Sequence, residues 1–275
     1  MEKEIKKTEI TSESKTVITE SVTTGDEKEK QEKAFERVAT KVLGRLDMVI
    51  AFDTTGSMAS YIEAVRKEVS ELIPSLFKDN KDLRLGIVAF GDYCDMKSAQ
   101  DFGNAYQCIK PTDNENDLIK FVNESKNTSG GDGDEFYELV IKKIVEETPW
   151  RDDSTRVILL IADAAPHELG YTYKDYVIGN QIDWREEAKK AASEGIKIDT
   201  VTITDTPWYK ELSAMTNGVS VPFRSGYKTA RLVEAAIFSR GSHASRMKFD
   251  KLADECEDEE MKMVFCSFQK ERNDE

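Results

Sequence analysis

The sequence lacks any sustained basic block, although it carries many charges. Of its 275 residues, 39 are Lys or Arg and 53 are Asp or Glu, which gives a formal net charge of −14. The most basic stretches, residues 2–7 and 27–33, alternate lysine with glutamate. Proteins that bind nucleic acid normally present a basic surface to the phosphates. The charge balance therefore predicts a protein that does not bind nucleic acid.

Long hydrophobic segments are also missing. The longest aliphatic run, residues 157–162, is far too short to span a bilayer. The first residues are charged and contain no apolar signal region. Apolar residues make up 39% of the protein, which is enough for a core. We therefore expect a soluble, acidic, cytoplasmic protein that does not insert into membranes.

Cysteine and histidine are scarce. The four cysteines show no C-x-x-C spacing and have no histidines at zinc-finger intervals, and the sequence has two histidines in all. Free thiols in a reducing compartment are expected, while a bridge between Cys94 and Cys108 stays open. A histidine-rich transition-metal site is hard to build from this composition.

The two ends of the sequence differ in amino-acid composition from its centre. Residues 1–25 are rich in Thr, Ser, Glu and Lys and are predicted to be disordered. Residues 26–44 are expected to form a short helix. Residues 241–275 form an acidic tail with an apolar cluster, which is compatible with a helix that docks on the domain or on a partner. That cluster consists of Met261, Met263, Val264, Phe265 and Phe268.

Residues 45–240 carry the pattern of one α/β domain. Short segments that are apolar on both faces alternate with amphipathic helical segments. Strands without a polar face indicate a parallel sheet that is covered by helices on both sides. We therefore expect a Rossmann-like, doubly wound, mostly parallel central sheet with helices on both faces. The expected strands are 46–52, 83–90, 106–110, 156–162, 196–203 and 219–223, and the expected helices are about 62–73, 115–123, 135–145, 181–194, 208–215 and 229–239, the first closing near Pro74.

Polar residues gather where the expected strands end. Residues 53–57 follow the first strand, residues 92–95 follow the second, and Asp163 ends the long central strand. A glycine-rich loop, residues 129–135, precedes a helix. Ligands of open α/β sheets bind beyond the carboxyl ends of the strands. These four segments are therefore the candidates for a functional site.

Carboxylates and hydroxyls dominate these segments, and neither Lys nor Arg occurs in them. Carboxylates that converge on one crevice repel each other unless they protonate or share a cation. Oxygen ligands favour a hard divalent ion, magnesium or manganese before zinc. We interpret Asp92 and Asp95 as turn residues. His167, four residues after Asp163, either lines the site or is a half-exposed loop histidine.

The stretch Asp-Thr-Thr-Gly-Ser after the first strand is the most informative motif. Asp53, Thr55 and Ser57 match the D-x-[ST]-x-S motif of the metal-ion-dependent adhesion site (MIDAS) in the von Willebrand factor type A (vWA) family, which this sequence resembles. Asp163 matches the family's aspartate at a later strand end. The resemblance covers about residues 45–240.

The glycine-rich loop narrows the resemblance to two branches of the family. It is similar to the G-G-D-x-P-E loop of the alpha-kinase-associated A domains and of the A-like domains in integrin β subunits. In the integrin-like branch, the residue that matches Glu135 is a metal ligand, and the residue that matches Asp132 serves a neighbouring ion. Asp134 stands where those loops carry proline. Ordinary A domains use a threonine from this region, for which Thr128 is the candidate.

The resemblance implies a bound Mg²⁺ or Mn²⁺ that captures an acidic group of a partner protein through an open coordination position. It implies no catalysis, and it suggests a scaffold or a subunit of a larger assembly. The acidic tail is a further candidate to occupy the ion, in an autoinhibited or self-associated form. The implied ligands are Asp53, Thr55, Ser57, Glu135 and Asp163, with Asp132, Thr128 and His167 beside the ion or at an adjacent one.

An enzymatic alternative rests on the same motif. Asp-x-Thr-Gly-[Thr/Ser] after a strand also resembles the phosphorylated-aspartate motif of the haloacid-dehalogenase and P-type ATPase group. Asp53 would then be a magnesium-assisted nucleophile that attacks phosphate. That chemistry also needs a lysine and a pair of acids at a later strand end. Asp163 is present there without a second acid.

Overall fold

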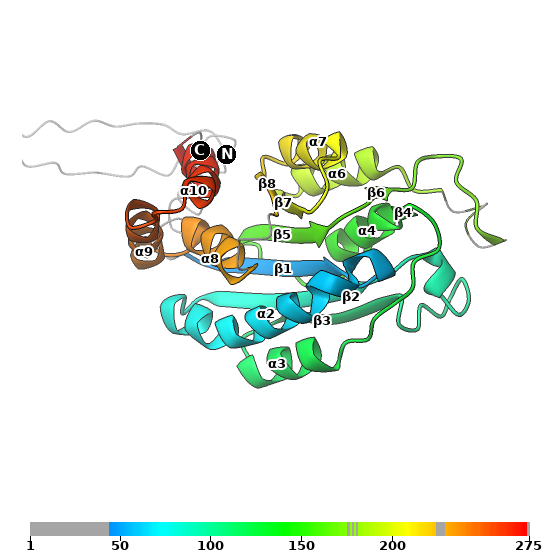
Figure 1. The fold of residues 1–275 in the computed structure, drawn as a ribbon, viewed down its shortest axis with the longest axis horizontal. Helices are drawn as coiled ribbons and strands as arrows, with labels where there is room; N and C mark the ends of the chain where they lie inside the picture. Colours follow the sequence, from blue (N-terminus) through cyan, green and yellow to red (C-terminus); the bar gives the residue numbers. More distant parts are fainter. Residues whose placement is uncertain (1–43, 175–176, 178, 180, 224–228, 274–275) are drawn as a thin grey trace, which may run out of the picture.

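The computed structural model describes residues 44–174, 177, 179, 181–223 and 229–273. The expected disordered segment 1–25 and all but the last residue of the expected helix 26–44 lie outside these residues. The centre of the domain is a six-stranded sheet in the order β3-β2-β1-β5-β7-β8 (Figure 1). Neighbouring strands are parallel except β3, which runs antiparallel to β2 at one edge. The strands are β1 (Leu46–Asp53), β2 (Leu83–Phe90), β3 (Tyr106–Thr112), β5 (Thr155–Ala162), β7 (Ile196–Thr202) and β8 (Ser220–Pro222).

Both faces of the sheet are covered, because side chains that alternate along a strand enter two separate cores. On β1, Met48 and Ile50 pack with one set of helices, while Val49 and Ala51 pack with the other. This arrangement confirms the expected α/β fold, with helices on both sides of a mostly parallel sheet. The first core includes residues of α2 (Ala59–Asp79), α3 (Glu115–Glu124), α8 (Thr229–Arg240), α9 (His243–Asp254) and α10 (Glu259–Asn273), and the second includes residues of α4 (Tyr137–Glu147), α6 (Trp184–Ser193) and α7 (Pro207–Met215).

Two local expectations were wrong. Helix α2 does not close near Pro74 but continues to Asp79, because Leu76 and Phe77 bury their side chains in the core beyond it. The helix expected from residue 135 begins instead at Tyr137. The two residues Asp134 and Glu135 form the short strand β4 (Asp134–Glu135), which pairs with β6 (Ala165–Pro166).

The tail after residue 240 is built from helices α9 and α10, which lie next to α8 (Figure 1). Four of the five apolar tail residues are buried in the first core, and Met263 is the exposed one. The tail is therefore an integral part of the domain in this structure. None of the described helices combines the length and apolarity that a membrane crossing requires. All four cysteines are free.

Candidate metal centre

The candidate centre lies at the carboxyl end of β1 and of its neighbour β5. Asp53 is the last residue of β1, and Asp163 directly follows β5, which pairs with β1 along its length. The short parallel pair of β4 and β6 places Glu135 opposite Pro166, three residues beyond Asp163. Segments far apart in the sequence thus meet at this edge, as the strand-end rule predicts.

Asp53 is fully buried, and hydrogen bonds hold both of its carboxylate oxygens. Oδ1 accepts from the Thr55 amide at 2.7 Å and from the Thr55 hydroxyl at 2.6 Å. Oδ2 accepts from the Tyr137 hydroxyl at 2.6 Å. Burial raises the pKa of Asp53 to about 6, although these hydrogen bonds lower it. The carboxylate is a fixed anchor for the residues around it.

A series of hydroxyls leads from Asp53 outward to Asp163. The Thr55 and Ser57 hydroxyls lie 3.2 Å apart, and the Ser57 hydroxyl donates to Asp163 Oδ1 at 3.2 Å. Burial raises the pKa of Asp163, against the effect of the Ser57 hydrogen bond. Ser57 is exposed, so solvent reaches this end of the series. Four of the five predicted ligands therefore form one connected group.

Glu135 is buried beside this group. A Cβ on Gly130 would lie 2.7 Å from Glu135 Oε1 and 3.2 Å from the Thr55 Cβ. Because glycine has no side chain, both Glu135 and Thr55 can pack closely against this position. Glu135 Oε2 is buried and has no hydrogen-bond partner among the described residues. Burial first, and then the charge of Asp53 and other aspartates, raise the pKa of Glu135 to about 9.

The donor chemistry of this group fits a hard divalent cation. It consists of carboxylate and hydroxyl oxygens, and one buried carboxylate oxygen has no partner within the described residues. Magnesium and manganese prefer such ligands. Thr55, Ser57, Asp163 and Glu135 have the atoms to hold an ion, whereas Asp53 already uses both oxygens and would act through the Thr55 hydroxyl.

The remaining predicted residues have other positions. The Thr128 hydroxyl lies 2.9 Å from that of Thr54, whose own hydroxyl donates to the Phe90 carbonyl. Thr128 thus ties the loops together next to the candidate ligands. Asp95, interpreted as a turn residue, accepts hydrogen bonds from the amides of Ser129 and Gly130 at 2.8 and 3.1 Å, and so holds the glycine-rich loop.

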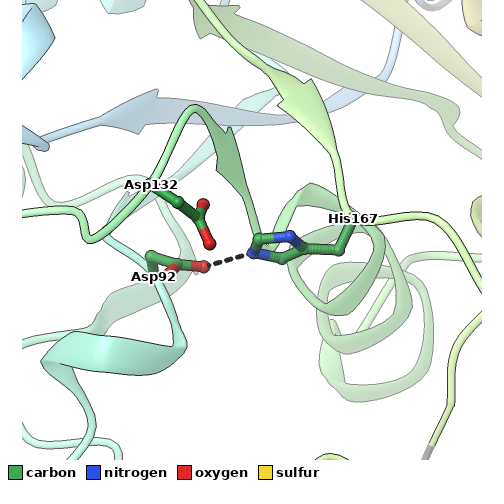
Figure 2. A group of neighbouring side chains, drawn as sticks. All are labelled: Asp92, Asp132 and His167. Atoms are coloured by element: carbon green, nitrogen blue, oxygen red, sulfur yellow. Dashed lines mark hydrogen bonds and ion pairs between the residues drawn. The ribbon is translucent and has the colours of Figure 1, made fainter. Parts of the chain in front are cut away.

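A second cluster lies nearby and joins Asp92, Asp132 and His167 (Figure 2). Each offers one ligand atom, and these atoms lie within 4.8 Å of one another. His167 Nε2 is 2.8 Å from Asp92 Oδ1, and the histidine is 3% exposed, so it is not a half-exposed loop residue. Burial lowers the pKa of His167, but Asp92 and the other nearby carboxylates raise it by more. Among the described residues, Asp53, Glu135 and Asp163 do not form such a compact group.

Tyr137 was not identified from the sequence. It is fully buried, donates to Asp53 Oδ2, and accepts from the Ala164 amide at 3.1 Å, so it links the ends of β1 and β5. Apart from its place two residues after Glu135, no sequence signal distinguishes it from an ordinary core tyrosine.

Tyr137→Phe is expected to reduce divalent-ion affinity more at pH 6 than at pH 8. Loss of the hydroxyl removes a hydrogen bond that lowers the pKa of Asp53, so this pKa rises above about 6 and protonation then competes with the ion. The substitution also leaves Asp53 Oδ2 and the Ala164 amide without their Tyr137 partner, which costs about 1–3 kcal/mol of stability. Calorimetric titration at both pH values tests this, with Tyr106→Phe on β3 as control. An equal loss at both pH values would contradict it.

Residues 47–228 match the family model of the von Willebrand factor type A domain. The sequence is 30% identical over 166 residues to alpha-protein kinase vwkA of Dictyostelium discoideum, a match that covers 25% of the kinase and 57% of this protein. It is 21% identical over 192 residues to the putative ariadne-like RING finger protein R811 of Acanthamoeba polyphaga mimivirus, covering 18% of that protein and 66% of this one. The present sequence thus spans a quarter or less of these relatives.

Among solved structures, proximal thread matrix protein 1 from the mussel byssus is similar in fold. The TM-score is 0.50 at 15% sequence identity, and the similarity covers 47% of that structure and 70% of this one. At this identity the likeness concerns the fold alone.

Proposed function

Because the protein belongs to the von Willebrand factor type A domain family, we propose that it is a divalent-metal-dependent protein-binding module. Domains of this family are interaction modules. The proposed ion is Mg²⁺ or Mn²⁺, held by Thr55, Ser57, Asp163 and Glu135, with Asp53 fixing Thr55. When bound, the ion supplies a positive charge that attracts a carboxylate of the partner protein.

The observation that carries this proposal is the buried side chain of Glu135. Its Oε2 has no partner among the described residues, and its Oε1 lies close to Gly130, which also contacts Thr55 of the connected group. A buried carboxylate without a partner is costly, and a shared cation removes that cost. The protein's net charge of −14 repels other acidic groups. A cation at the centre is therefore what allows an acidic ligand to bind here.

The metal part of the proposal is tested by calorimetric titration of Mg²⁺ and Mn²⁺ into the EDTA-stripped 275-residue protein. We expect one ion per molecule in the wild type and no measurable binding in Asp163→Ala. Asp205→Ala is the matched control, because this exposed aspartate follows the neighbouring strand β7 and pairs with Lys210 on the surface. Binding that survives in Asp163→Ala would remove this residue from the site.

The partner part needs a separate measurement. Peptides that contain a single Glu or Asp, each matched with its amide form, are titrated in Mg²⁺ and in EDTA. The proposal expects binding of the carboxylate peptides alone, and only in Mg²⁺. Equal binding of the amide peptides would reject capture of an acidic group. Membership of a larger cytoplasmic assembly is part of the same proposal.

The enzymatic alternative is a magnesium-dependent phosphotransferase with Asp53 as nucleophile. A nucleophilic carboxylate must present a free oxygen to phosphate, whereas Asp53 is fully buried with both oxygens hydrogen-bonded. We propose that the domain is not catalytic. Hydrolysis of p-nitrophenyl phosphate or acetyl phosphate with Mg²⁺, lost in Asp53→Asn, would favour the alternative instead.

A further inference from the structure

The cluster of Asp92, Asp132 and His167 differs from the oxygen-only centre by its imidazole nitrogen. Its three members come from separate segments: Asp92 follows β2, Asp132 lies in the glycine-rich loop and His167 follows β6 (Figure 2). Two of them are almost completely buried, with Asp92 at 0% and His167 at 3% exposure, whereas Asp132 is exposed. Solvent therefore reaches the cluster from the Asp132 side.

One atom of this cluster has no partner within the described residues. Asp92 Oδ2 is buried and makes no hydrogen bond there, although its Oδ1 contacts His167. A buried carboxylate oxygen in this state carries a desolvation cost that a bound cation would remove. The unpartnered oxygen is a second indication of a ligand, independent of the spacing of the three side chains.

Tyr171 holds two of the three side chains in place. Its ring stacks on the His167 imidazole, with centroids 3.6 Å apart and planes at 12°, and its hydroxyl donates to Asp132 Oδ2 at 3.3 Å. Tyr93 packs on the same imidazole, with ring centroids 5.5 Å apart. Supporting contacts that fix the orientation of ligands are typical of metal sites.

We propose that Asp92, Asp132 and His167 form a second metal site. It binds Zn²⁺ or a chemically similar transition-metal ion and leaves one coordination position to water. Imidazole is a ligand for zinc, cobalt, copper and iron, whereas calcium and magnesium take oxygen ligands. Three protein ligands with a fourth, open position are a common arrangement for zinc. The residue that distinguishes this site from the oxygen-only centre is His167.

The test uses the 275-residue protein, stripped with EDTA and kept in excess Mg²⁺ to saturate the proposed oxygen-only centre. Zn²⁺ and Co²⁺ are titrated by calorimetry, Co²⁺ also by visible absorption, and Ca²⁺ serves as the oxygen-preferring comparison. We expect one Zn²⁺ or Co²⁺ per molecule, without comparable binding of Ca²⁺. His167→Ala should weaken binding by more than about 100-fold, because loss of an outer partner alone costs 10–100-fold.

Two further measurements guard against a folding artefact. Asp132→Asn changes an exposed residue and should also abolish binding. The sequence has two histidines, so imidazole ¹⁵N spectra resolve His167 from His243, and only the His167 signals should move with Zn²⁺. His243→Ala is the matched control and should bind normally. The proposal is overturned if the wild type binds no Zn²⁺, if Ca²⁺ binds equally well, or if His167→Ala or Asp132→Asn retains wild-type affinity.

Discussion

Glu135→Gln is expected to abolish binding of Mg²⁺ while making the metal-free protein more stable at alkaline pH. The pKa of Glu135 is about 9 in the folded state and 4.5 in its ordinary state, so the folded state binds the extra proton between these values. The stability that the protonated Glu135 side chain contributes is therefore fully present below about pH 4.5 and is lost as the pH rises through about 9. Glutamine has the same shape and cannot ionise, so the loss disappears.

The measurement is the melting temperature in EDTA from about pH 5 to pH 9, for the wild type and Glu135→Gln. The pKa of Asp53 is raised from 3.8 to about 6, so both proteins also lose a smaller amount of stability as the pH rises between these two values. The wild type should therefore fall more steeply than the variant, and Mg²⁺ should restore the wild type only. Glu124→Gln, an exposed substitution on α3, should follow the wild type. A variant that melts lower than the wild type at pH 8 in EDTA would contradict this account.

Arg240→Met is expected to destabilise the domain by about 3–5 kcal/mol, because it leaves a buried charge uncompensated. Arg240 is 5% exposed, and its Nη1 and Nη2 lie 2.7 and 2.9 Å from the two carboxylate oxygens of Asp199 on β7. It also lies 3.4 Å from Glu271 and stacks over the ring of Phe268, both on α10. For a domain of this size the loss corresponds to a drop in melting temperature of roughly 6–20 °C.

Thermal unfolding of two further variants separates the charge effect from lost packing. Arg240→Met combined with Asp199→Asn removes both buried charges and should recover much of the loss. Arg185→Met removes a partly exposed arginine on α6 that pairs with Glu168, and should change stability by no more than about 1 kcal/mol. If the double variant is as unstable as Arg240→Met, packing against Phe268 rather than the buried charge is the dominant contribution.

The sequence by itself determined the class of fold and the order of its elements. Segments apolar on both faces identified β1, β2, β5 and β7, because strands buried on both sides leave no polar face. Asp53, Thr55 and Ser57 were also identified from the sequence, because the three residues lie within one short motif at the end of β1. Helix ends were less accurate: Pro74 is tolerated inside α2 where the following turn buries apolar residues.

The strand-end rule placed Asp163 near Ser57 in advance, but only the tertiary structure identified the distant partners of His167 and Tyr137. His167 contacts Asp92 across 75 residues, and Tyr137 donates to Asp53 across 84. These contacts depend on sheet register and loop closure, so the sequence around each residue does not indicate its partner. The acidic tail shows the same dependence, because its apolar residues could cover this domain or a partner, and the packing of α10 beside α8 decides that they cover the domain. Local pattern determines an element, and only the folded molecule determines its neighbours.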